Sequence, residues 1–70
     1  ADEFEAVTGQ TGFTLSRNPK LNTKAKMFVN GRLISLKAFT VKGLTATYFP
    51  ENNKNYVLAE GDLIQIFYFY

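Results

Sequence analysis

Apolar and polar side chains alternate through most of this chain, and turn-forming residues interrupt the alternation at short intervals. Ala25, Met27 and Val29 fall on one face of an extended chain, and Lys26 and Phe28 fall on the other. A side-chain period of two is the pattern of a β-strand. No window of ten or more residues has helical spacing. The sequence therefore predicts an all-β fold of about seven short strands, arranged as a small antiparallel sandwich or barrel.

Turn signals separate the expected strands. Asn-Gly is the strongest short hairpin signal, because a type I′ turn needs two consecutive residues with positive φ. We expect Asp62 to cap its turn through a hydrogen bond that its carboxylate accepts from the backbone, a structural role and not a catalytic one. The residues predicted to form structural turns are Asn30, Gly31, Gly43, Gly61 and Asp62.

The length of 70 residues allows one domain, which we place at residues 1–70. A chain of this size buries only about 60% of its unfolded surface, so a single copy is marginally stable. The sequence has no cysteine, so no disulfide bond adds to this marginal stability. Tight packing or self-association must supply the remaining stability.

The residue types that most enzymes need are missing. Histidine, the commonest general base and metal ligand, is absent along with cysteine. The six acidic residues show no paired spacing, and the glycines of residues 9–12 precede neither a helix nor a Gly-Lys-Ser/Thr sequence. We predict no catalytic residues, no metal site and no cofactor.

The segment Leu63–Tyr70 is apolar on both faces, unlike a strand with one face in water. Ile64 and Ile66 would face the core, which leaves Phe67 and Phe69 on the opposite face. Exposed apolar patches usually mark interfaces, so we expect another subunit to cover this face. The predicted subunit interface is Phe28, Phe49, Leu63, Phe67 and Phe69.

Basic residues gather in one part of the chain. Residues 17–42 hold seven Lys and Arg residues and no acidic residue, whereas the rest holds six carboxylates and only one basic residue, Lys54. Solvated strand faces explain most of these charges, and complementary acidic and basic surfaces help identical subunits assemble. The alternative is a small nucleic-acid-binding β-barrel that uses this stretch, with contacts from Lys24, Lys26, Phe28 and Arg32.

No targeting or membrane-spanning segment is visible. The start of the chain is acidic, and the longest apolar stretch, Ile66–Tyr70, is far shorter than the roughly 20 residues of a membrane span. We therefore expect no membrane insertion. Because the first residue is Ala1 and not Met, we also expect the chain to be processed or excised from a longer one.

The order of turns and strands resembles a module of bacteriophage tail-fibre and appendage proteins. The shared features are a Gly-Gln-Thr turn, a Phe-Thr-Leu strand, a proline, a Val-Asn-Gly hairpin, a second hairpin closed by glycine, and a final Gly-Asp strand that ends in aromatic residues. These features lie in Thr8–Ser16, Pro19, Met27–Gly31, Phe39–Gly43, Thr45–Tyr48 and Leu58–Tyr68. The match covers about residues 4–70, and the basic charge and the lysine- and asparagine-rich loops depart from it.

The resemblance implies an immunoglobulin-like or jelly-roll-like β-sandwich without enzymatic activity. Such a module serves attachment, spacing and host-surface contact in a tail fibre or capsid decoration. Its location is the virion, and its partners are copies of itself in a homotrimer, other virion proteins, and a host-surface glycan or protein. Nucleic acid is not expected as a partner. A third interpretation is a carbohydrate-contacting tip in which Tyr48, Tyr56 or Tyr70 stacks on sugar.

Overall fold

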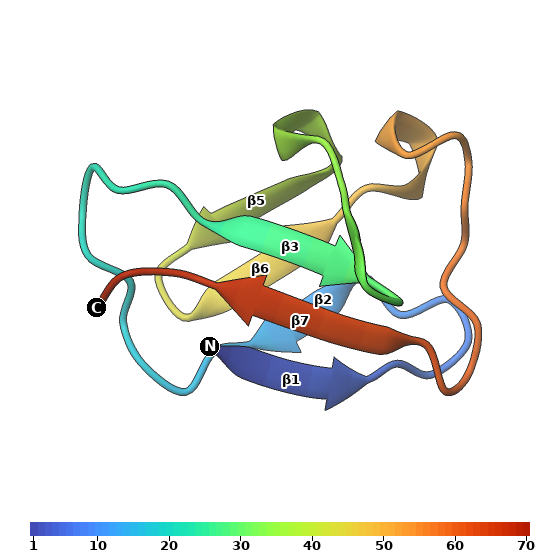
Figure 1. The fold of residues 1–70 in the computed structure, drawn as a ribbon, viewed down its shortest axis with the longest axis horizontal. Helices are drawn as coiled ribbons and strands as arrows, with labels where there is room; N and C mark the ends of the chain where they lie inside the picture. The colour runs from blue at the N-terminus through green and yellow to red at the C-terminus, as the bar shows by residue number, and fades with distance from the viewer.

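Seven short strands form two antiparallel sheets in a computed structural model that describes residues 1–70 (Figure 1). The four-stranded sheet has the order β1-β7-β3-β4, formed by β1 (Asp2–Glu5), β7 (Leu63–Phe67), β3 (Lys26–Val29) and β4 (Arg32–Leu33). The three-stranded sheet has the order β2-β6-β5, formed by β2 (Gly12–Thr14), β6 (Thr45–Tyr48) and β5 (Phe39–Lys42). Two short 3₁₀ helices, η1 (Leu36–Ala38) and η2 (Pro50–Asn52), follow β4 and β6. The predicted all-β class is confirmed.

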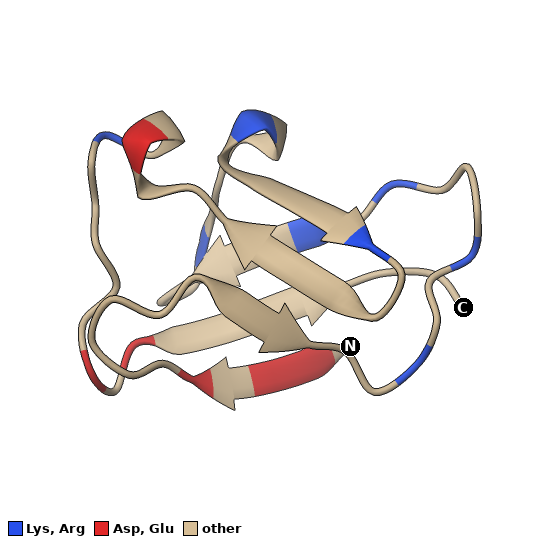
Figure 2. Ribbon diagram, turned by 180° about the vertical axis from the view of Figure 1, so that it is seen from behind, with Lys and Arg blue, Asp and Glu red and all other residues tan.

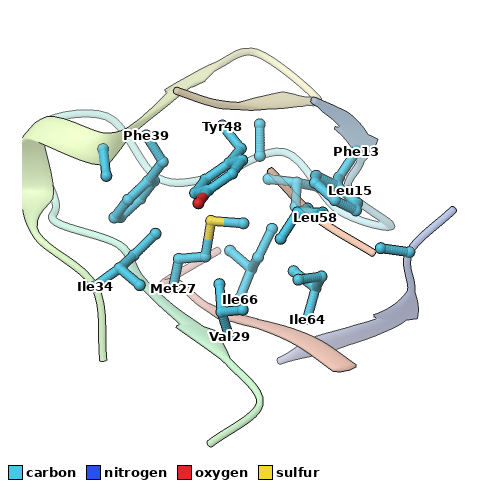
Figure 3. Close-up of a cluster of buried hydrophobic side chains, with 13 residues drawn as sticks. Phe13, Leu15, Met27, Val29, Ile34, Phe39, Tyr48, Leu58, Ile64 and Ile66 are labelled. Carbon is cyan, nitrogen blue, oxygen red and sulfur yellow. The ribbon is translucent and has the colours of Figure 1, made fainter. Parts of the chain in front are cut away.

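The core lies between the two sheets, and most of its side chains come from alternate residues of the strands (Figure 3). Met27 and Val29 point inward from β3, while Ala46 and Tyr48 point inward from β6. Leu58 adds an inward side chain from the irregular segment before β7. The thirteen buried residues are all apolar or aromatic: Ala6, Phe13, Leu15, Met27, Val29, Ile34, Ala38, Phe39, Ala46, Tyr48, Leu58, Ile64 and Ile66.

Strand β7 is central because it pairs with β1 on one side and β3 on the other. Ile64 and Ile66 are fully buried, as the alternation indicates. The sequence predicted a strand as far as Tyr70, but β7 ends at Phe67. Beyond that residue the Lys20 N–H donates to the Phe69 carbonyl over 2.7 Å, so the loop before β3 replaces a neighbouring strand.

The hairpin after β3 turns tightly and its return strand is short. Asn30 and Gly31 have φ of 51° and 83°, and they connect β3 to β4. The return strand, β4, has only two residues. The Ser35 hydroxyl accepts a hydrogen bond from the Lys37 N–H at 3.1 Å and starts η1 instead.

The structure contains no helix with the length and apolar composition of a membrane span. It also brings no three carboxylate, imidazole or thiol side chains together in a way that would hold a metal ion.

Candidate functional site

The strand register gathers several exposed apolar side chains on the outer face of the four-stranded sheet. Residues opposite each other in antiparallel strands share a face. Gln65 lies opposite Phe28, and Phe28 lies opposite Leu33, so these side chains form one row across the sheet. Leu63 and Phe67 belong to the same face, because they are two residues either side of Gln65 in β7. Leu33, Leu63 and Phe67 are all exposed.

Aromatic rings define one end of this outer face. The Phe28 and Phe67 rings meet edge to face with their centroids 5.5 Å apart. Phe69, in the extended tail after β7, is exposed beside them. Together with Lys24 and Lys26 they surround a hollow of about 440 Å³, which we call the phenylalanine hollow. Its full lining is Ala1, Lys24, Lys26, Phe28, Phe67, Tyr68 and Phe69.

Four of the five residues predicted for the subunit interface lie on or next to the outer face: Phe28, Leu63, Phe67 and Phe69. Phe49 does not, and its assignment is a correction. It follows β6 in the other sheet, where the inward positions are Ala46 and Tyr48 and Phe49 is half-buried. Leu33 belongs to the face and was missed. The tight Asn-Gly turn sets the register that places Leu33 opposite Phe28, and that signal was present in the sequence.

Opposite charges flank the outer face. Glu3 and Glu5 are exposed on β1, and Glu3 accepts a hydrogen bond of 2.9 Å from the Gln65 amide. Lys24 and Lys26 lie on the other side of β7, at the start of β3. Figure 2 shows acidic residues on β1 and most of the basic residues at one end of the molecule, around the loop that precedes β3. A second copy that places its acidic strand over this basic end would gain electrostatic attraction beside the apolar outer face.

The residues of the nucleic-acid alternative are only partly together. Lys24, Lys26 and Phe28 all line the phenylalanine hollow. Arg32 does not, and this is a second correction. It lies opposite Val29, whose side chain points into the core, so Arg32 belongs to the other side of the sheet.

A carboxylate network that the sequence did not indicate joins the two ends of the chain. Asp2 accepts hydrogen bonds from the Ser16 N–H at 2.8 Å, the Ser16 hydroxyl at 2.7 Å and the Tyr68 hydroxyl at 2.7 Å. These donors, led by the Ser16 N–H, lower the pKa of Asp2 below its ordinary value of 3.8. The Tyr68 hydroxyl also accepts from the Arg17 N–H over 3.2 Å. The network ties β1 to the chain after β2 and to the tail after β7.

Asp62 organises the opposite end. Its carboxylate accepts from the Asn30 amide at 3.0 Å, the Ala59 N–H at 2.9 Å and the Tyr56 hydroxyl at 2.7 Å. These bonds, the one from Asn30 first, lower the pKa of Asp62, and the bond to Asp62 raises the pKa of Tyr56 above its ordinary value of 10.0. The carboxylate thus caps its turn by accepting from the Ala59 N–H, as predicted. The side chains of Asn30 and Tyr56 donate to it as well, so its role is structural.

The three tyrosines considered for sugar stacking lie in different environments. Tyr48 is only 1% exposed, and its hydroxyl donates to the Tyr56 carbonyl over 2.6 Å. Its ring is core, so that prediction was wrong. Tyr70 is exposed, with the Arg17 guanidinium 4.7 Å from its ring centroid. Tyr56 is 41% exposed and lies beside a second, more polar hollow.

No family model, curated protein or solved structure matches this chain.

Proposed function

We propose that this protein is a non-enzymatic, self-associating structural module of a bacteriophage particle, in a tail fibre, an appendage or a capsid decoration. The observation that supports self-association most directly is the exposed apolar outer face of the four-stranded sheet. The resemblance to tail-fibre modules supports the virion setting. It also supports the finer expectations of an immunoglobulin-like or jelly-roll-like arrangement, a homotrimer, and contact with other virion proteins and a host-surface glycan or protein.

The energetic argument for a covered outer face rests on its aromatic side chains. Complete burial of one Phe or Leu side chain contributes roughly 1.5–3 kcal/mol, and a domain of this size is stable by only a few times that amount. The outer face exposes Leu33, Leu63, Phe67 and Phe69. Covering even half of this surface would raise the stability of each copy by a large fraction.

The charges on either side of the outer face favour a second copy of this chain as the occupant. Glu3 and Glu5 are on β1, whereas Lys24 and Lys26 are beyond β7. Both signs are present on one surface, so the acidic side of one copy is complementary to the basic side of the next, and such a head-to-tail contact is the kind that closes a ring. A partner of a single charge would match only one side.

The test is a pair of double variants. Phe67 and Phe69 are 45% and 65% exposed, and Phe67→Ser with Phe69→Ser removes the aromatic end of the outer face. The matched control is Leu21→Ser with Val57→Ser, since these side chains are 87% and 56% exposed outside that face. We expect the first variant to have the 7.9 kDa mass of one chain in light scattering and an unchanged circular dichroism spectrum. The control keeps the mass of the unmodified protein. Equal masses for the two variants would contradict the interface assignment.

Nucleic-acid binding is the second candidate, because Lys24, Lys26 and Phe28 meet at the phenylalanine hollow. Single-strand binders combine cations that contact the phosphates with aromatic rings that stack on the bases. Binding of a labelled oligothymidylate would then weaken steeply between about 50 and 200 mM salt, and more so in the unmodified protein than in Lys24→Ala with Lys26→Ala. If the protein is only a structural module, neither the unmodified protein nor the double variant binds the oligonucleotide.

A further inference from the structure

A second hollow, of about 490 Å³, lies away from the outer face. One wall comes from the β3–β4 hairpin and the residue that follows it, and the other comes from the segment after η2; in Figure 1 these are the green and orange parts of the chain. Its volume falls within the range of about 300–1,000 Å³ that is usual for small-molecule sites. We call it the polar hollow. Its lining is Val29, Asn30, Arg32, Ile34, Asn53, Lys54, Asn55 and Tyr56.

The polar hollow has a positive electrostatic character. Arg32 and Lys54 both line it, one from each wall, and no carboxylate is among the lining residues. Asp62 is the acidic group bonded to that lining, and its carboxylate already accepts from the Asn30 amide and the Tyr56 hydroxyl. An anionic group that entered between Arg32 and Lys54 would find two cations and no competing acid in the lining.

The wall that carries Tyr56 is held in place before any ligand arrives. The Tyr56 hydroxyl donates to Asp62 over 2.7 Å, and the Tyr56 carbonyl accepts from the buried Tyr48 hydroxyl over 2.6 Å. The Asn53 amide donates to the same Tyr48 hydroxyl over 2.9 Å. These bonds fix Tyr56, a residue that is 41% exposed and that lines the polar hollow together with Asn53 and Asn55. A fixed ring loses little conformational entropy when a ligand binds.

The turn that joins these residues adopts an unusual backbone for its sequence. The Tyr56 N–H donates to the Asn53 carbonyl over 3.0 Å, and the two residues between them, Lys54 and Asn55, have φ of 55° and 58°. Two consecutive positive φ values usually select Asn-Gly or Gly-Gly, as at Asn30-Gly31. Lysine is a poor residue for this conformation, and strained backbone of this kind concentrates at ligand sites. Here it places a cation and an amide in the lining of the polar hollow.

We propose that the polar hollow binds an anionic saccharide, a sugar ring that carries a carboxylate or a phosphate group. The anionic group meets Arg32 and Lys54, the sugar ring packs on Tyr56, and the hydroxyls pair with the amide of Asn55. An aromatic ring offers an apolar surface to the C–H face of a sugar, an amide both donates to and accepts from hydroxyls, and the two cations favour acidic sugars. The proposal does not rest on self-association, because no residue of the polar hollow belongs to the outer face.

The test is a titration of the ¹⁵N-labelled protein, followed in ¹H–¹⁵N spectra at constant ionic strength. The probes are glucuronate, glucose 6-phosphate, glucose and acetate. We expect the first two to shift the amide signals of residues 29–34 and 53–56 with a saturating dependence. The stronger of the two identifies the preferred anionic group. Glucose and acetate bind more weakly, because each lacks one half of the recognised chemistry. Equal affinity for acetate and glucuronate would overturn the saccharide assignment.

Variants locate the site. Arg32→Ala with Lys54→Ala should weaken glucuronate binding by about tenfold or more, because it removes both cations of the polar hollow. The control, Lys20→Ala with Lys42→Ala, removes two exposed lysines outside the polar hollow and should leave binding unchanged. Lys54→Gly also removes the cation, and glycine adopts the positive φ of this position without strain. A loss of binding in this variant is therefore not explained by misfolding of the turn. Unchanged affinity in both Lys54 variants, or equal loss in the control, would contradict the proposal. Phe67→Ser with Phe69→Ser should bind normally, which separates this result from the fate of the outer face.

Discussion

Buried and half-buried polar groups in this protein act as junctions between segments distant in sequence. Tyr48 is the clearest case: its ring is in the core, its hydroxyl donates to the Tyr56 carbonyl, and it accepts from the Asn53 amide. Period-two alternation places Tyr48 on the same face of β6 as Ala46, but it does not predict these partners. They belong to a loop whose path depends on the tertiary structure.

Tyr48→Phe should destabilise the protein by about 1–3 kcal/mol, because it leaves a carbonyl and an amide of the loop at residues 53–56 without their partner. Tyr70→Phe is the matched control, since Tyr70 is 63% exposed and its ring lies outside the core. Urea unfolding followed by circular dichroism measures both. An equal midpoint for Tyr48→Phe and the unmodified protein would refute the role given to this hydroxyl.

The hydrogen bonds of Asp2 predict that the protein becomes less stable in acid. Its pKa is lowered in the folded state from 3.8, so its ionised form is favoured by folding. Its contribution is therefore fully present at pH values well above 3.8 and is lost as the pH falls through the lowered pKa of the folded state. We expect the urea midpoint of the unmodified protein to fall as the pH is lowered from about 5 to 3, because this range brackets the ordinary pKa of an aspartate. Asp2→Asn should show a smaller fall, with the remainder due to Asp62, whose pKa is also lowered. An identical pH profile in this variant would contradict the network.

The elements themselves were largely predictable from the sequence, whereas their ends were not. Alternation indicated which residues of β3, β6 and β7 face the core, and Asn30-Gly31 marked the hairpin. The end of β7 depends on a hydrogen bond that the Lys20 N–H donates to the Phe69 carbonyl. Lys20 lies in a loop about fifty residues earlier in the chain. The shortness of β4 depends on Ser35, which caps η1. Both are contacts that a local pattern does not contain.

The hairpin turn can be tested through its glycine. Gly31 has φ of 83°, and a Cβ there would meet no atom within 4 Å, so Gly31→Ala tests the backbone conformation alone. We expect a cost of about 1–2 kcal/mol. Gly12 in β2 has equally open space and no positive φ, so Gly12→Ala should be neutral or slightly stabilising. Thermal unfolding of the two variants gives the comparison, and equal melting temperatures would disprove the conformational argument.

For the molecule as a whole, the two sheets are only large enough to bury one of the two apolar faces of β7. Thirteen of 70 residues are buried, while Leu33, Leu63, Phe67 and Phe69 remain exposed on the outer face or in the tail beside it. The sequence predicted that the second face of β7 needs a cover. It misplaced Phe49, because the strand pattern alone does not reveal which sheet each strand joins. It missed the polar hollow, because Arg32 and Lys54 are brought together only by the fold.

The central claim is that identical chains cover one another's outer face. The most direct measurement is the molar mass of the unmodified protein by light scattering after size exclusion, at low and high salt and over a range of concentrations. We predict a trimer at three times the 7.9 kDa chain mass, which persists at high salt because most of the interface is apolar. A mass of 7.9 kDa at every concentration would contradict the account and leave the outer face exposed in the working protein.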